Sequence, residues 1–194
     1  FANIAIKEAS VDDMLLAVQR LVGLDVDANA TIRNAYIQLC DLQHYEMAAE
    51  VLGLIEGTLL ETDLRAARAL EEGDPERALQ ILDRGLIESA DHISFLMRKG
   101  IALEAMGKLS DAISMFEQVL HLNPEHQSAS QRRLKCGLKI WTEKKYFNEI
   151  TQATDRFPQN INHQFARLNY VLSVKKDYDL ALEIVNTCLH HHRK

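Results

Sequence analysis

Apolar residues along this chain recur at spacings of three and four, and no run alternates apolar and polar residues between turns. A recurrence of this kind is the period of an amphipathic α-helix, in which one apolar stripe faces the core. A β-strand with one buried face would need a period of two instead. The pattern therefore predicts an all-α protein, beginning with a helix near Val11 to Val22.

Two segments of the chain repeat each other: GDPERALQILDRGLIESA from Gly73 and GKLSDAISMFEQVLHLNP from Gly107. We call the separation of these two glycines in the sequence the repeat offset. In both segments, an alanine follows the glycine after five residues and a large apolar residue follows after four more. Glycine takes the left-handed conformation that ends a helix, and alanine lets two antiparallel helices approach closely. This spacing predicts a repeated helix-turn-helix unit. The positions after the glycine are Ala78 and Leu82 in the first copy and Ala112 and Phe116 in the second.

Weaker copies of this unit flank the two clear ones, at QHYEMAAEVLGLI, KKYFNEITQATDRFP and KKDYDLALEIVNTCL. Each follows about 15 residues with helical periodicity. The sequence thus predicts an N-terminal segment with one helix (1–28) and an array of five helix pairs (29–194). The predicted pairs are 29–58, 59–92, 93–126, 130–160 and 162–194.

The unit from Ile93 to His126 resembles a tetratricopeptide repeat, with the family's pattern at Gly100, Gly107, Ala112, Phe116 and Pro124. The fourth unit departs from the pattern, since Glu149 stands where alanine is usual. The resemblance implies a right-handed α-solenoid whose first helices line a concave groove. It also implies a non-enzymatic scaffold or adaptor that binds a peptide or helical segment of a partner protein. Two other roles stay open: a secretion-type chaperone with one dedicated client, and a regulatory region of a larger enzyme.

The resemblance also implies which side chains line the groove. Position 9 of the five units reads as an apolar row, and position 6 of the last three units is basic. Such a groove suits an amphipathic segment with acidic residues. The alternative is that position 9 is partly core and that the basic residues pair with neighbouring acids such as Glu104. The predicted groove residues are Arg33, Asn34, Ile37, Asp63, Leu64, Met97, Arg98, Ile101, Lys135, Leu138, Arg167 and Tyr170.

Charge is divided unevenly along the chain, whose net charge is −6. Residues 1–106 hold 19 acidic and 9 basic side chains, whereas residues 107–194 hold 9 acidic and 13 basic ones. The two halves therefore carry opposite charge. Overall acidity argues against nucleic acid as the partner, and no apolar run is long enough to predict membrane insertion.

Catalytic and ligand-binding motifs are absent from the sequence: it has no phosphate-binding glycine loop, HExxH, paired CxxC or GxSxG. We expect no enzyme activity, no cofactor and no specific metal site. Consecutive helical residues point about 100° apart, so His190, His191 and His192 cannot share one tetrahedral site. The three cysteines are few, odd in number and far apart, which indicates free thiols and a cytoplasmic location.

The two ends of the array carry apolar stripes wider than one neighbouring helix covers, in the first predicted helix and in the last one. The chain also begins with Phe1 rather than Met, which is typical of a piece of a longer protein. We therefore expect the terminal helices to pack against flanking segments or against a second copy in a homodimer.

Overall fold

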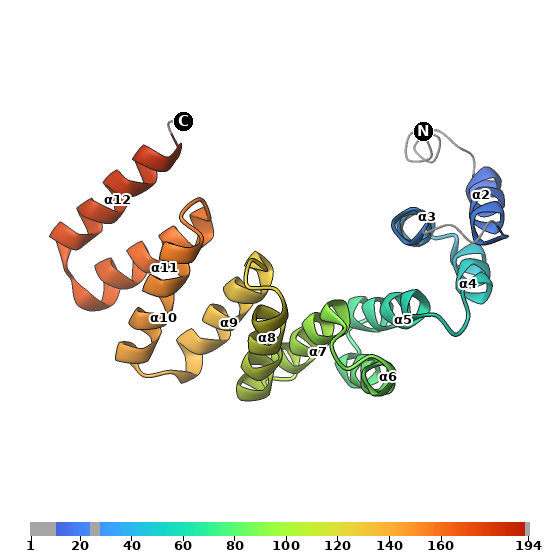
Figure 1. The fold of residues 1–194 in the computed structure, drawn as a ribbon, viewed down its shortest axis with the longest axis horizontal. Coiled ribbons are helices and arrows are strands. Elements are labelled where there is room, and N and C mark those ends of the chain that lie inside the picture. Colours follow the sequence, from blue (N-terminus) through green and yellow to red (C-terminus); the bar gives the residue numbers. More distant parts are fainter. Residues whose placement is uncertain (1–10, 24–27, 193–194) are drawn as a thin grey trace. The chain divides into compact units, whose positions relative to one another are not determined.

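The computed structural model describes residues 11–23 and 28–192, and every regular element in these ranges is helical (Figure 1). The all-α fold predicted from the sequence is confirmed. The elements are α2 (Val11–Gly23), α3 (Asn29–Asp41), α4 (Tyr45–Leu54), α5 (Leu59–Glu71), α6 (Pro75–Glu88), α7 (Ile93–Ala105), α8 (Leu109–Leu122), α9 (Gln127–Ile140), α10 (Glu143–Arg156), α11 (Ile161–Tyr170), the π-helical segment η1 (Val171–Lys175) and α12 (Tyr178–His192).

The chain forms two compact units, Phe1–Gly85 and Leu86–Lys194. In the first unit, α2 packs against α3 and α4, and these helices share one apolar core. Its fully buried side chains include Val18 of α2, Leu39 of α3 and Val51 of α4. The helix predicted near Val11 to Val22 is therefore present as α2, and it covers the first helix pair.

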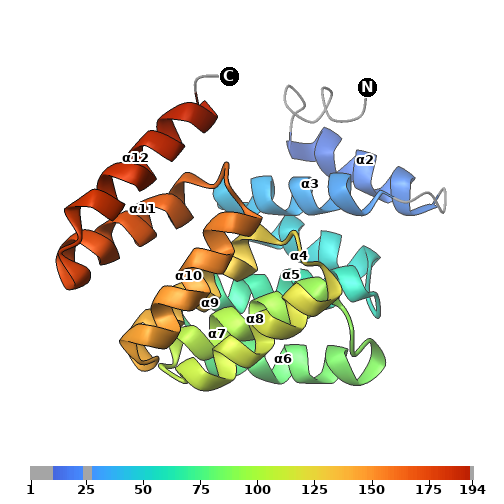
Figure 2. The same cartoon turned by 60° about the vertical axis from the view of Figure 1, so that its left-hand side comes forward.

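The second unit contains three successive helix pairs, α7–α8, α9–α10 and α11–α12, and each helix packs against the next in chain order. Figure 2 shows α7, α8 and α9 side by side. Phe116 and Ala112 of α8 are fully buried. A Cβ atom added at Gly100 of α7 would lie 2.5 Å from Cε1 of Phe116. The glycine thus lets the two helices touch, as the repeat pattern predicted.

The turn inside the helix pair is the same in four of the five pairs. Its central residue has a positive φ at Gln43 (62°), Gly73 (76°), Gly107 (75°) and Lys176 (55°). Glycine takes this left-handed conformation freely, whereas a residue with a Cβ is strained in it. The fourth pair turns differently, since Trp141 is extended there (φ −84°, ψ 155°).

The fourth pair follows the repeat offset more closely than the sequence predicted. Its first helix begins at Gln127, three residues before the predicted start at position 130. His92 and His126, the N-cap residues of α7 and α9, are separated by the same interval as Gly73 and Gly107. Pro124 and Pro158, which follow α8 and α10, have this separation too. The fourth unit is therefore in register with the third.

A tyrosine in place of alanine explains this error of register. Tyr146 stands one repeat offset after Ala112 and is 4% exposed, so it fills the position where the two helices of the pair meet. Glu149, which the sequence placed there, is half-buried and accepts a hydrogen bond from Arg133 at 2.6 Å. Because a large aromatic residue stands where the repeat pattern has alanine, the register of this unit is difficult to recognise in the sequence.

The fifth pair contains one additional residue. Its N-cap Asn160 lies two repeat offsets after His92, as the repeat requires. Its turn residue Lys176, however, lies one position beyond the point two repeat offsets after Gly107. The π-helical turn η1 takes up the extra residue, because a π-turn spans one residue more than an α-turn. The helix α11 itself begins at Ile161, next to the predicted start at position 162.

Candidate functional site

Two predicted groove residues of the first unit form an ion pair between consecutive first helices. Arg33 of α3 donates from Nη1 to Oδ2 of Asp63 of α5 at 2.6 Å. The Asp63 side chain is 1% exposed and that of Arg33 is 34% exposed, while Leu64 belongs to the core. The prediction that Asp63 and Leu64 line a binding surface is therefore wrong, because neither side chain reaches solvent.

The outer side of α3 carries the other two predicted residues of this unit. Asn34 is exposed and Ile37 is 45% exposed. Their role in binding stays a prediction.

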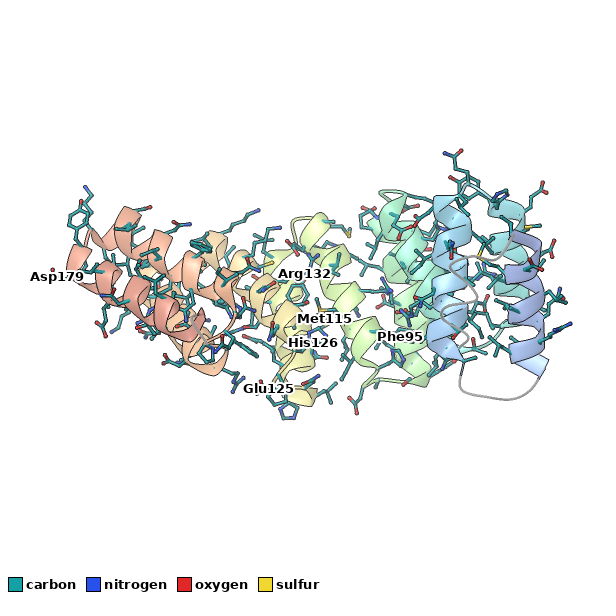
Figure 3. The ribbon with its side chains drawn as sticks, turned by 90° about the horizontal axis from the view of Figure 1, so that it is seen from above. Phe95, Met115, Glu125, His126, Arg132 and Asp179 are labelled. Atoms are coloured by element: carbon teal, nitrogen blue, oxygen red, sulfur yellow. The ribbon has the colours of Figure 1, made fainter. Side chains whose placement is uncertain are left out.

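In the second unit, α7 and α9 together present a mixed basic and apolar surface, which we call the α7–α9 face. Leu138 is 57% exposed, and the α7 side chains of the face are all partly exposed. Figure 3 shows Arg132 within α9 and His126 at the start of this helix. The face consists of Met97, Arg98, Ile101 and Glu104 of α7 and Arg132, Lys135 and Leu138 of α9.

One carboxylate and two cations form the centre of the α7–α9 face. Oε2 of Glu104 accepts from Nη1 of Arg132 at 2.7 Å, and its Oε1 accepts from Nζ of Lys135 at 2.9 Å. Burial opposes ionisation of Glu104, but the hydrogen bonds from Lys135 and Arg132 outweigh it and lower the pKa of this carboxyl. The pairing with Glu104, which the sequence left as an alternative, is present for Lys135. With Arg98 included, the face carries three basic side chains and one acidic one.

The predicted basic row of Arg98, Lys135 and Arg167 does not form, because α9 and α11 begin earlier than the sequence predicted. Arg132, and not Lys135, lies one repeat offset after Arg98. Sequence reasoning missed Arg132, although the regular spacing of the N-cap histidines and of the two prolines was a sufficient signal. Lys135 instead occupies the repeat position of Ile101.

Arg167 and Tyr170 lie away from the α7–α9 face. Arg167 donates from Nη1 to Oγ1 of Thr154 at 3.3 Å and lines a pocket of about 290 Å³ with residues of α10 and α12. Tyr170 is 7% exposed, and its hydroxyl donates to the backbone oxygen of Glu143 at 3.0 Å. Tyr170 is thus a core residue of the fifth pair, and its predicted place in the groove is wrong.

Other reactive side chains form no site in the part of the chain that the structure describes. It contains no group of three His, Cys, Asp or Glu residues placed to hold a metal ion. The cysteines Cys40, Cys136 and Cys188 are free thiols, and burial raises the pKa of each. The side chains of His190, His191 and His192 lie outside the described residues. None of the described helices has the length and apolar character needed to cross a membrane.

The repeat geometry agrees with a match to a known family. Residues 69–135 match the family model of the tetratricopeptide repeat. This segment consists of tetratricopeptide repeats. It spans α6, α7 and α8 and most of α9, so the candidate face lies within the matched segment except for Leu138.

Curated relatives match only part of this chain and a smaller part of themselves. The human FK506-binding protein-like is 34% identical over 76 residues, which are 39% of this chain and 22% of the relative. Prolyl 4-hydroxylase subunit alpha-1 of Gallus gallus is 33% identical over 81 residues, 42% of this chain and 16% of the relative. The matched segment thus spans about a fifth of the length of these proteins.

Solved structures with the same fold cover most of the chain. MamA from Desulfovibrio magneticus RS-1 aligns with a TM-score of 0.65 and 19% identity over 87% of this chain and 97% of that chain. YrrB, described as a TPR protein with an unusual peptide-binding site, aligns with a TM-score of 0.60 and 18% identity over 86% and 88%. The first TPR of RPAP3, bound to an HSP90 peptide, aligns with a TM-score of 0.53 and 13% identity over 60% of this chain and 92% of that chain. At these identities the likeness establishes the fold.

Proposed function

We propose that this chain is a non-enzymatic protein-binding scaffold and that its α7–α9 face holds a peptide segment with acidic residues. The proposal rests on the contacts of Arg132 and Lys135 of α9 with Glu104 of α7, together with Arg98 on α7 and the exposed Leu138 on α9. Arginine binds carboxylates through a planar set of donors, and apolar side chains beside it bind the neighbouring residues of the peptide.

Glu104 has a specific part in this proposal. Its carboxylate lies where a ligand carboxylate would bind and holds Arg132 and Lys135 in place. An incoming acidic residue then shares or replaces a contact that is already formed, so little side-chain entropy is lost on binding. The proposed site is thus preorganised, at the cost of competition from Glu104.

The comparisons support binding of peptides in general. YrrB is described as peptide-binding, and the RPAP3 repeat is bound to the peptide SRMEEVD, which contains three acidic residues. A second role is favoured by the match to a prolyl hydroxylase subunit, in which this array would be a regulatory or substrate-binding region of a larger enzyme. The free thiols suit a reducing compartment such as the cytoplasm.

Neutralising the basic side chains tests the proposal. The variant combines Arg98→Gln, Arg132→Gln and Lys135→Gln with Glu104→Gln, so that the Glu104 carboxylate is not left without its two partners. We expect it to bind a fluorescent acetyl-Glu-Leu-Glu-Ile-Glu-amide peptide at least tenfold more weakly in anisotropy titrations, since each charge-assisted hydrogen bond contributes about 1.5–3 kcal/mol. Glu104→Gln alone should bind the peptide several-fold more tightly.

The matched control replaces three exposed basic residues elsewhere, by Arg84→Gln, Lys108→Gln and Arg156→Gln. This variant lowers the net charge by three, whereas the fourfold variant at the face lowers it by two, and it should still keep wild-type affinity. Equal binding by the two multiple variants, or tighter binding of the corresponding lysine peptide, would contradict the proposal.

A further inference from the structure

A second groove lies in the second unit at the turns within its last two helix pairs, away from the α7–α9 face. It has a volume of about 590 Å³. We call it the turn groove. It is lined by Glu143, Lys144, Phe147 and Asn148 of α10 and by Tyr170, Val174 and Lys175 of α11 and η1.

The floor of the turn groove is a fixed aromatic platform. The ring of Phe147 stacks on that of Tyr170 with 5.8 Å between centroids, and Tyr170 packs on Tyr146 at 5.2 Å. The Tyr170 hydroxyl is anchored to the Glu143 backbone oxygen. Beside this platform, Val174 is 44% exposed. An apolar side chain of a ligand therefore meets a rigid surface, and little ordering is needed to bind it.

Two lysines line the turn groove. Nζ of Lys175 lies 3.5 Å from the centroid of the Phe147 ring, in a cation–π contact. Lys144 is exposed on the first turn of α10. Within the described ranges, no carboxylate forms an ion pair with either lysine. Both ammonium groups are therefore available to an anionic ligand.

The acidic groups nearby are partly engaged in the fold. Glu143 lines the same groove, but it lies in the first turn of α10, where the helix N-terminus favours a negative charge. Oδ1 of Asp177 accepts a hydrogen bond from the backbone N–H of Leu180 at the start of α12. Lys176 follows Lys175 directly, and it is exposed. The groove and its rim thus keep more positive than negative charge.

The backbone departs from regular geometry in the wall of this groove. Val174 and Lys175 belong to the π-helical turn η1, and Lys176 after it has a φ of 55°. A π-turn is rare and a left-handed lysine is strained, and both features recur at functional sites. The inserted residue of the fifth pair is thus part of the segment that forms the wall of the groove.

We propose that the turn groove binds a short peptide segment in which two adjacent apolar residues are flanked by acidic residues. The apolar side chains lie against Val174 and the edge of Phe147, and the two carboxylates pair with Lys144 and Lys175. A carboxylate on Lys175 is held above the Phe147 ring, where the ammonium is already positioned. This site works independently of the α7–α9 face.

The test uses three blocked peptides of equal length and the whole chain labelled with ¹⁵N. The peptides are acetyl-Glu-Leu-Phe-Glu-amide, acetyl-Lys-Leu-Phe-Lys-amide and acetyl-Glu-Ser-Ser-Glu-amide. We expect only the first to shift the amide resonances of Phe147, Val174 and Lys175. Lys144→Glu with Lys175→Glu should weaken this binding at least tenfold, whereas the control pair Lys108→Glu with Arg156→Glu should change it less than twofold.

Several results would overturn the proposal. These are shifts confined to the α7–α9 face, equal binding of the lysine peptide, unchanged binding by the Lys144 and Lys175 variant, and no binding at millimolar peptide. Because the double charge reversal touches only exposed side chains, its circular dichroism should match that of the wild type. A Val174→Thr variant, which keeps side-chain shape, provides a second measure and should weaken binding several-fold.

Discussion

Each unit joins two consecutive first helices by an arginine and a carboxylate, but the two arrangements differ in their exposure and balance of charge. In the first unit, Arg33 pairs with Asp63, whose side chain is 1% exposed. In the second, Arg132 and Lys135 share Glu104, whose side chain is 13% exposed, and Lys135 itself is 66% exposed. The first arrangement is closed and serves stability, while the second leaves positive charge at the surface.

This difference shows how one kind of contact serves two purposes. A buried carboxylate needs its partner, because an unpaired buried charge is strongly destabilising. A partly exposed carboxylate with two partners loses less when one of them leaves. A ligand carboxylate can therefore replace Glu104 at one of its basic partners, whereas it cannot reach the buried Asp63 carboxylate.

The largest expected effect comes from removing the arginine of each arrangement. Arg33→Met should lower the free energy of unfolding of the first unit by about 1.5–3 kcal/mol, since the buried Asp63 carboxylate loses the hydrogen bond from Arg33 and water cannot replace it. Arg132→Met should cost about 1 kcal/mol or less, because Lys135 still pairs with Glu104. Urea unfolding followed by circular dichroism measures both. Equal losses in the two variants would contradict the claim that the Arg33–Asp63 pair contributes more to stability than the contact of Arg132 with Glu104.

The fluorescence of Trp141, the single tryptophan of the sequence, reports on the second unit alone. Arg33→Met should leave the fluorescence transition nearly unchanged while it shifts part of the dichroism transition. Asn34→Ala, an exposed neighbour on α3, provides the control and should cost less than about 0.5 kcal/mol.

Acid should destabilise the second unit more than the first, because a histidine of the fifth pair is buried. His163 is 1% exposed, neither ring nitrogen has a hydrogen-bond partner, and burial lowers its pKa from 6.5 to about 4. The folded state therefore disfavours the proton, and stability present above pH 6.5 is lost as the pH falls toward 4. We expect the second unit to lose about 2–3 kcal/mol between pH 7 and pH 4.5.

A His163→Leu variant should lose most of this pH dependence, as measured by urea unfolding followed by Trp141 fluorescence at the two pH values. The exposed His121 provides the control, and His121→Gln should behave as the wild type does. If His163→Leu kept the full acid dependence, other groups would be responsible for it.

The smallest changes in stability are expected from substitutions in the left-handed turns within helix pairs, a kind of turn that occurs in both units. Gln43→Gly and Lys176→Gly should each raise the free energy of unfolding by about 0.5–1 kcal/mol, because glycine relieves the left-handed strain. Only Lys176→Gly should shift the fluorescence transition of Trp141. A loss of stability in either variant would show that the side chain contributes more than the backbone strain costs.

Much of the repeat could be predicted from local chemistry. The helical period, the glycine turns at Gly73 and Gly107, and the contact of Gly100 with Phe116 follow from residues that act within one helix pair. The predicted binding residues depended instead on register across pairs. Because Tyr146 stands where a small residue is usual, the fourth unit was predicted to begin three residues too late.

The all-α class, the helix-turn-helix unit and the basic character of residues 107–194 follow from the sequence, because periodicity, turn residues and charge are local properties. The shared contact of Arg132 and Lys135 with Glu104 is seen in the packing of α9 against its neighbours. The extra residue of the fifth pair is absorbed by a π-turn, a choice made by the packing of Tyr170 and Val171 into the core. The place of Arg132 on the face follows from the repeat offset, which α9 keeps, whereas Arg167 of α11 lies one position after the residue that corresponds to Arg98 and Arg132.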